Sequence, residues 1–197
     1  MSRVVLATHN AHKVAEFQAI VAEIRPDLEV IAYDGPEPVE DGVSFAENAL
    51  IKARAASAHT GLPSLADDSG ICVHVLGGAP GVFSAYWAGH AKNDRANLEL
   101  LLDQLADIRD PHRTAHYNST IALVTPGGIE HTVEGIWPGR LADAPRGTGG
   151  FGYDPIFIPE GQDGAERSVA ELTPQEKNAV SHRARAFREL GPLLAAL

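Results

Sequence analysis

The sequence predicts an α/β fold in which helices flank a mixed central β-sheet. Short apolar and β-branched runs alternate along the chain with longer segments whose apolar residues recur at helical spacing. The segments 114–124 and 129–137 flank a Pro-Gly-Gly turn and read as a β-hairpin, which makes the sheet mixed. The 197 residues, of which 44% are hydrophobic, show no interdomain linker, so we expect one domain over 1–197.

The first strand, expected over Arg3–Ala7, leads through a tight loop into a helix with apolar residues at helical spacing. Polar side chains and a cation stand at the start of this helix, where backbone N–H groups favour anions. These residues are Thr8, Asn10 and Lys13. They form a credible phosphate cradle that lacks the glycine-rich Walker pattern, and a capped helix with a surface lysine is the alternative.

The second strand is expected over 28–32, and a loop rich in proline and acidic residues follows over 33–42. Ser44 and Glu47 match a capping box, which predicts a helix that starts at Ser44 and runs to about residue 59. The cap explains Glu47. Glu40, near the end of the loop, has no such local role and is the better candidate metal ligand.

Two adjacent acids, Asp67 and Asp68, follow an apolar run and precede Gly70. We expect one strand up to the acids, a turn that Gly70 permits, and another strand over 71–75. A buried carboxylate is costly unless it is paired or binds a metal, so the two acids are plausible ligands of a hard divalent cation. A solvated turn is the alternative interpretation.

The glycine-rich stretch 147–152 matches the G-x-G-x-x-G pattern of dinucleotide-binding folds. That pattern should follow a strand and open a helix, whereas 153–158 reads as a turn and a strand, so we reject this interpretation. The aromatic residues favour close approach of the backbone to a ligand, with Phe151 as a stacking ring, over a flexible surface loop.

Two further amphipathic helices are expected, one over 93–105 and a last one that a capping box opens at Thr173. We expect the last helix to continue to the C-terminus. It carries Lys177, His182 and Arg183, which are either ligand contacts or part of a solvated face.

Composition argues against several classes of protein. The formal net charge of −10 disfavours binding to nucleic acid polymers or to an anionic membrane. The sequence contains no run of 18 apolar residues, so no transmembrane helix is expected. The apolar run at 4–6 is too short for a signal peptide. The one cysteine, Cys72, excludes an internal disulfide. We therefore expect a cytoplasmic protein.

A phosphate cradle, a divalent metal site and a stacking ring together describe a nucleotide ligand. The chain also resembles the inosine triphosphate pyrophosphatase family over essentially its whole length. That family hydrolyses non-standard purine nucleoside triphosphates such as ITP, dITP and XTP to the monophosphate and pyrophosphate. The resemblance rests on Thr8-His9-Asn10-Ala11-His12-Lys13, Phe45-Ala46-Glu47-Asn48-Ala49, Ala66-Asp67-Asp68-Ser69-Gly70, Gly77-Gly78-Ala79-Pro80-Gly81, Gly147 to Pro155, and Ser181-His182-Arg183.

The resemblance implies a Mg²⁺-dependent homodimer whose two lobes flank an active-site cleft, and which removes these nucleotides before they enter DNA or RNA. Glu40 and Asp68 would hold Mg²⁺, and Asp68 would also activate water. Thr8, Asn10 and Lys13 would hold the phosphates together with Lys52, and His9, Ala11 and His12 would be further substrate-binding residues. The remaining substrate contacts would be Ser69, Phe151, Gly152, Tyr153, Asp154, Lys177, His182 and Arg183, with Phe151 stacked on the base.

Three positions depart from the family pattern. His9 stands where glycine is usual, His74 where aspartate is common, and Tyr86 where arginine is usual. The departure at Tyr86 concerns phosphate or dimer contacts rather than the reaction.

Three alternatives remain open. A pyrophosphatase for pyrimidine triphosphates would carry a Ser-Pro-Arg-Arg type signature, which this chain lacks. A nucleotide-sensing module without catalysis is disfavoured by the retained pair of acids. An aspartic protease would match Asp68-Ser69-Gly70, but the chain has one copy, and Lys13 and Phe151 would be unexplained.

Overall fold

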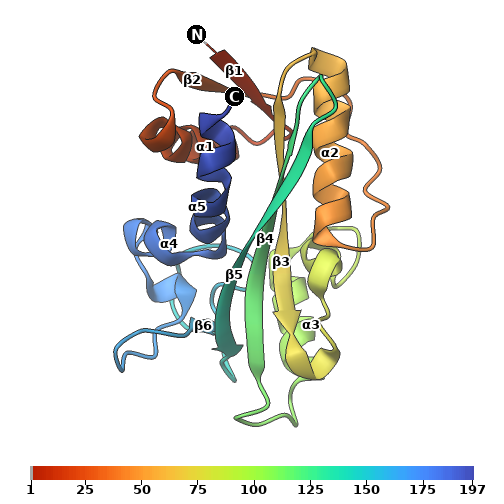
Figure 1. Ribbon diagram of the computed structural model, residues 1–197. Coiled ribbons are helices and arrows are strands. Elements are labelled where there is room, and N and C mark those ends of the chain that lie inside the picture. Colours follow the sequence, from red (N-terminus) through yellow and green to blue (C-terminus); the bar gives the residue numbers. More distant parts are fainter. Residues whose placement is uncertain (1) are drawn as a thin grey trace. The chain divides into compact units, whose positions relative to one another are not determined.

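The computed structural model describes residues 2–197, which form a six-stranded sheet with the order β2-β1-β3-β4-β5-β6 (Figure 1). β1 pairs in parallel with β2 and β3, whereas β5 and β6 are antiparallel, so the sheet is mixed as the sequence predicts. The strands are β1 (Ser2–Leu6), β2 (Leu28–Ala32), β3 (Ser64–Val73), β4 (Thr114–Val124), β5 (Glu130–Leu141) and β6 (Phe157–Pro159).

The helices of the described residues include five α-helices and three short 3₁₀ helices. The α-helices are α1 (Ala11–Ile24), α2 (Phe45–Thr60), α3 (Asp94–Gln104), α4 (Pro174–Val180) and α5 (His182–Ala195). The 3₁₀ helices are η1 (His74–Leu76), η2 (Gly81–Tyr86) and η3 (Val169–Glu171). None of these helices is long and apolar enough to cross a membrane.

The chain divides into two compact units. Unit 1 comprises 1–68, 119–135 and 186–197, and unit 2 comprises 69–118 and 136–185. Strands β3, β4 and β5 each contribute residues to both units. Each unit has its own hydrophobic core.

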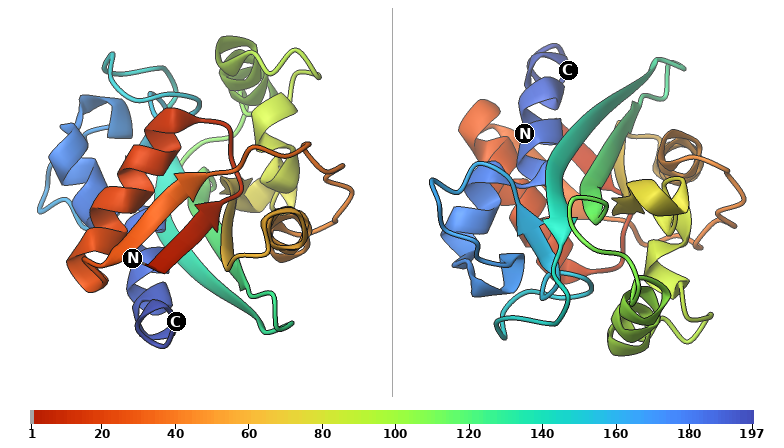
Figure 2. Two further views of the ribbon diagram at one scale, coloured as in Figure 1. Left: turned by 90° about the horizontal axis from the view of Figure 1, so that it is seen from above. Right: turned by 90° about the horizontal axis from the view of Figure 1, so that it is seen from below.

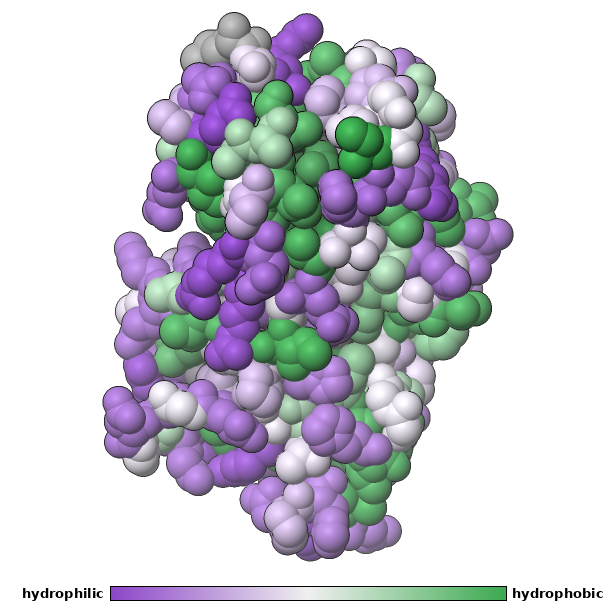
Figure 3. Space-filling model, viewed as in Figure 1, coloured by the Kyte–Doolittle hydropathy of each residue, from purple (hydrophilic) through white to green (hydrophobic). Residues whose placement is uncertain are grey.

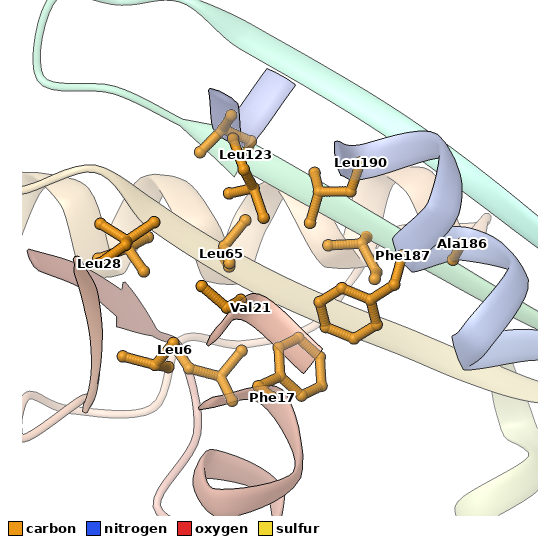
Figure 4. Close-up of a cluster of buried hydrophobic side chains, with 13 residues drawn as sticks. Leu6, Phe17, Val21, Leu28, Leu65, Leu123, Ala186, Phe187 and Leu190 are labelled. Atoms are coloured by element: carbon orange, nitrogen blue, oxygen red, sulfur yellow. The ribbon is translucent and has the colours of Figure 1, made fainter. Parts of the chain in front are cut away.

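In unit 1, helices cover both faces of the strands because successive side chains of a strand point to opposite faces. On one face, the rings of Phe17 in α1 and Phe187 in α5 meet edge to face at 4.5 Å, beside Leu65 of β3 (Figure 4). On the other face, small side chains of α2 pack on Ala66 of β3 and Ala122 of β4. Figure 2 shows α1 running alongside β1 and β2.

In unit 2, a second core forms around large buried side chains that include Trp137 and Phe157. Leu98, Leu101 and Leu105, which the sequence predicts to share one helix face, are buried in this core. The buried guanidinium of Arg113 donates to four backbone carbonyls, at 2.8 to 3.0 Å, so its hydrogen-bonding groups are satisfied without solvent.

The prediction of a turn at Gly70 is wrong, because β3 continues unbroken through the two acids to Val73, and η1 follows. The glycine serves close packing. A Cβ atom at Gly70 would collide with the Ser84 hydroxyl and with the backbone carbonyl of Gly81. After Val73 the chain forms a 3₁₀ helix over 74–76, whereas the sequence predicts a strand that continues to residue 75.

The prediction of one continuous last helix is also wrong. α4 ends at Val180, and Ser181 is extended, with ψ of 165°. Its N–H closes α4 on the carbonyl of Lys177, while its hydroxyl accepts the N–H of Ala184 at 3.3 Å and so caps α5. Because of this break, Lys177 lies in α4 and Arg183 lies in α5.

Most other predicted elements are confirmed. β2 and β4 have the predicted bounds, and α2 begins after Ser44, whose hydroxyl accepts the N–H of Glu47 at 3.2 Å. The Glu47 carboxylate accepts the N–H of Val43 and not that of Ser44, so the capping box is only half formed.

On the face in Figure 3, hydrophilic and hydrophobic residues are interspersed.

Candidate functional site

Unit 1 carries a cavity of about 160 Å³, which we call the anion pocket. It lies where the parallel strands β1 and β2 end, a position at which α/β sheets commonly bind ligands. Its polar lining includes Thr8, His9, Lys13, Glu40, Lys52 and Asp67.

The loop between β1 and α1 is shaped by its own polar side chains. The Thr8 hydroxyl accepts the N–H of Asn10 at 3.2 Å, and the Asn10 side-chain oxygen accepts the N–H of Lys13 at 3.4 Å. Asn10 therefore caps the start of α1, and the lysine that follows lies in its first turn. This is the strand-loop-helix arrangement that the sequence predicts for an anion site.

The two adjacent acids of β3 point to opposite faces of the strand and find different partners. Asp67, with its side chain 2% exposed, accepts from the Ser119 hydroxyl at 2.7 Å and lies 3.5 Å from the Lys13 ammonium of α1. Asp68 lies 2.8 Å from the Lys52 ammonium of α2, which also lies 3.0 Å from the Glu40 carboxylate. Three carboxylates thus share two lysines.

Burial and the neighbouring charges shift the pKa of Asp68. Burial raises the pKa of the Asp68 carboxyl, the Lys52 ammonium opposes that rise, and the Glu40 and Asp67 charges add to it. Burial alone lowers the pKa of Lys52, but the Asp68 and Glu40 charges outweigh it, so the net shift is upward. Lys52 therefore stays cationic, while Asp68 holds a proton more readily than an ordinary aspartate.

The donor set of the anion pocket fits a hard divalent cation. One oxygen each of Glu40 and Asp68 already converges on a single cation, the Lys52 ammonium, within 3.0 Å. Mg²⁺ is usually bound by one or two protein carboxylates and completes its shell with water and substrate phosphates. Residues 2–197 hold no cluster of three or more His, Cys, Asp or Glu side chains suited to a metal.

His9, which replaces the usual glycine, links two loops of the anion pocket. Its ring stacks on Tyr33 at 5.8 Å, with the planes 6° apart. One ring nitrogen lies 3.0 Å from the Gly35 carbonyl, and the other lies 3.3 Å from the Glu37 carboxylate. His9 thereby fastens the loop after β1 to the loop that carries Glu40.

Unit 2 carries a second cavity of about 140 Å³, which we call the base pocket. At its centre the buried Asp154 carboxylate accepts from the Lys177 ammonium at 2.6 Å, the Phe151 N–H at 2.9 Å and the Tyr117 hydroxyl at 3.3 Å. Burial raises the pKa of the Tyr117 hydroxyl well above its usual value, and the Asp154 charge adds to the rise, so this hydroxyl stays a donor. Lys177 also lies 4.7 Å from the centre of the Phe151 ring.

Aromatic and cationic groups from the start of α5 complete the base pocket. The His182 ring stacks on Tyr117 at 4.8 Å and faces Trp137 at 6.3 Å. The Arg183 guanidinium donates to the Ser69 hydroxyl at 3.3 Å. Phe151 stays 61% exposed, so one ring face is available for stacking against a planar ligand.

All the candidate residues of unit 2 line one cavity. They are Ser69, Phe151, Gly152, Tyr153, Asp154, Lys177, His182 and Arg183. In unit 1, Thr8, His9, Lys13, Glu40 and Lys52 line the anion pocket, and Asp68 contacts it through Lys52. Asn10 acts as a helix cap, Ala11 is the exposed first residue of α1, and the His12 side chain lies outside the described part of the chain.

Sequence reasoning misses several lining residues, among them Tyr117, Asp94 and Tyr33. Tyr117 lies on the same face of β4 as the buried residues Ala115 and Ile121, so the sequence pattern does not distinguish it from a core residue. Asp94 opens α3 and reads as an ordinary first-turn acid. The one available signal is the N-cap at Asn93, which places Asp94 at a helix start.

Comparisons with known proteins place the chain among established relatives. The model of the Ham1 family matches residues 4–193. A dITP/XTP pyrophosphatase of Leifsonia xyli subsp. xyli is 60% identical over 197 residues, which cover 100% of this chain and 98% of the relative. A dITP/XTP pyrophosphatase of Streptomyces coelicolor is 54% identical over 201 residues, which cover 100% of this chain and 99% of the relative.

Solved structures agree with this placement. A HAM1 protein from Coxiella burnetii superposes with a TM-score of 0.90 at 40% identity, and the match covers 100% of both chains. A nucleoside-triphosphatase, or dITP/XTP pyrophosphatase, from Mycobacterium abscessus gives a TM-score of 0.81 at 47% identity, covering 95% of this chain and 98% of that one. The predicted fold class is confirmed by these neighbours.

Proposed function

This chain belongs to the Ham1 family, and from that premise we propose that it hydrolyses dITP, XTP and related non-standard purine nucleoside triphosphates to the monophosphate and pyrophosphate. Relatives with this activity in their names match the whole chain at up to 60% identity. In the molecule itself, the observation that carries the proposal is the half-buried Asp68 carboxylate, which shares the Lys52 ammonium with Glu40.

The charged groups of the anion pocket suit the triphosphate. Lys13 and Lys52 supply two ammonium groups, and the start of α1 supplies backbone N–H groups with a favourable dipole. Thr8 adds a hydroxyl beside them. These groups would hold the β- and γ-phosphates, so that the bond to the α-phosphorus is presented to water.

Asp68 is the group that we assign to water activation. Its raised pKa brings the carboxylate closer to the working pH, which makes it a better proton acceptor than an ordinary aspartate. Asp68 takes a proton from the attacking water, oxygen bonds to the α-phosphorus, and pyrophosphate leaves with the bonding electrons. Glu40 and Asp68 would hold Mg²⁺, which when bound supplies positive charge to the phosphate oxygens.

The base pocket suits a purine that carries a carbonyl group at position 6. Arg183 can only donate hydrogen bonds, and so can the Lys177 ammonium, whereas adenine presents an amino donor at that position. A pocket built around such donors rejects an analogue that lacks the matching acceptor. The exposed Phe151 ring would stack on the base whatever its identity, so it contributes affinity rather than choice.

We also propose that the protein is a homodimer and acts in the cytoplasm, where it would draw on the nucleotide pool. Unit 2 exposes the hydrophobic side chains of Val75 and Phe83, at 45% and 51%, which a second chain would cover. Light scattering coupled to size-exclusion chromatography tests the dimer, and a monomeric mass at micromolar concentration would contradict it.

Product analysis tests the proposed reaction. Phosphorus NMR of XTP or dITP incubated with the protein and Mg²⁺ should show monophosphate and pyrophosphate, with no orthophosphate at early times. Asp68→Asn serves as the inactive control, and Asp103→Asn, an exposed aspartate of α3, as the active one. A nucleoside diphosphate with orthophosphate would refute cleavage between the α- and β-phosphates.

A further inference from the structure

At the end of β3, unit 2 brings two imidazole rings into direct contact. His74 opens η1, and His116 lies on the neighbouring part of β4. The Nε2 atom of His74 lies 3.1 Å from the Nδ1 atom of His116, and the ring centres are 5.3 Å apart. The proposed hydrolysis uses neither residue, and His74 replaces an aspartate that is common at this position of the family.

The two nitrogens are within hydrogen-bonding distance of each other, and their separation also equals that of two ligands on one metal ion. Zinc binds imidazole nitrogen at about 2.0–2.1 Å, so two nitrogens lie about 2.9 Å apart at a right angle and about 3.3 Å apart at the tetrahedral angle. The observed 3.1 Å falls between these values.

A third residue orients the pair as metal sites require. The Nδ1 atom of His74 lies 2.9 Å from the Thr114 hydroxyl oxygen, which can accept its N–H. When the Thr114 hydroxyl accepts this N–H, the Nε2 atom of His74 carries a lone pair, and the contact restrains the ring. His74 is exposed and His116 half-buried, so an ion and its water ligands can reach the pair from solvent.

We propose that His74 and His116 form a two-histidine site for a divalent transition-metal ion of the zinc class. Imidazole favours zinc, copper and nickel over magnesium, so this site differs chemically from the carboxylates Glu40 and Asp68. The described residues offer no cluster of three or more metal-binding side chains, so water completes the shell and the ion exchanges readily. A bound ion would tie η1 to β4.

Calorimetric titration with zinc chloride in excess Mg²⁺ tests the site. The unmodified protein should bind one zinc ion per chain at this site, and His74→Ala or His116→Ala should weaken that binding at least tenfold. His131→Ala removes an exposed histidine of β5 and is the matched control, for which the affinity should not change. Zinc at tenfold its dissociation constant should raise the Tm of the unmodified protein by about 3–5 °C, but not that of His74→Ala.

Two further variants separate this site from the hydrolytic one. Thr114→Val removes the acceptor that orients His74 and should weaken zinc binding about tenfold. Asp68→Asn should leave zinc binding intact although hydrolysis is lost. The proposal is overturned if the unmodified protein binds no zinc, if both histidine variants bind it unchanged, or if Asp68→Asn abolishes the binding.

Discussion

The anion pocket and the base pocket satisfy their buried charges in different ways. In the anion pocket, lysines and carboxylates contact one another with an excess of acid, and burial, together with the charges of Glu40 and Asp67, raises the pKa of Asp68. In the base pocket, Asp154 is satisfied by three donors from different segments, which hold the lining of the cavity in place.

This difference suggests a division of labour. The paired charges of the anion pocket can exchange partners when a phosphate or a cation arrives, so the anion pocket suits chemistry. A carboxylate that fixes a loop and a helix gives a rigid surface, so the base pocket suits recognition. Changes in the first pocket should therefore affect all substrates alike, and changes in the second should affect the choice of base.

The largest effect is expected for Asp68→Asn. The amide cannot accept a proton from water, so kcat should fall by about 10²–10⁴-fold for every nucleoside triphosphate tested. Substrate binding should remain measurable by titration, because Lys13 is retained. Near-normal turnover in this variant would show that Asp68 does not activate water, and the assignment of the anion pocket to chemistry would fail.

Lys13→Ala should have the next largest effect. A charge-assisted contact typically contributes about 1.5–3 kcal/mol, so kcat/KM should fall by roughly 10–150-fold. The loss should be equal for XTP and ATP, since both carry the same phosphates. Steady-state kinetics on the two substrates measures this, and a loss confined to one base would break the division between the pockets.

Arg183→Ala should change selectivity instead. We expect kcat/KM for XTP and ITP to fall by about 10–100-fold while the value for ATP changes little, because adenine offers no acceptor to this donor at position 6. The ratio of kcat/KM between XTP or ITP and ATP therefore decreases, because the values for XTP and ITP fall. Arg188→Ala, an exposed arginine of the same helix, is the matched control. A uniform loss on all bases would place Arg183 with the phosphates.

The smallest effect is a shift in pH dependence. The pKa of Asp68 is raised by burial, so the acid limb of kcat/KM should lie above the ordinary aspartate value of about 3.9, with activity falling as pH drops through it. Lys52 lowers the pKa of Asp68, so Lys52→Gln should move this limb to higher pH, whatever it does to the plateau. An inflection that moves to lower pH would contradict the contact between the two residues.

The fold is largely predictable from the sequence where local patterns decide the structure. β2 and β4 match the predicted bounds because β2 is mostly apolar and the residues of β4 alternate, as is typical of strands, and Ser44 caps α2 as its side chain permits. The two errors have tertiary causes. Gly70 is required by the close approach of Ser84, and Ser181 breaks a helix although its side chain is compatible with one.

The candidate site follows the same rule. Residues that the sequence singles out, such as Phe151 and Lys177, line one cavity. Tyr117 escapes prediction because only the folded chain sets its hydroxyl against Asp154. The contact of Lys52 with both Glu40 and Asp68 likewise joins segments far apart in the sequence, so spacing alone does not reveal it.

The most direct test of the central claim is kcat/KM of the unmodified protein for XTP, dITP, GTP and ATP with Mg²⁺, measured as pyrophosphate release. The account predicts that XTP and dITP exceed ATP by about 10²-fold or more, since a donor-lined pocket can discriminate by as much as about 10⁴–10⁵-fold. Equal values for ATP and dITP would contradict the assignment of the base pocket and, with it, the proposed substrate class.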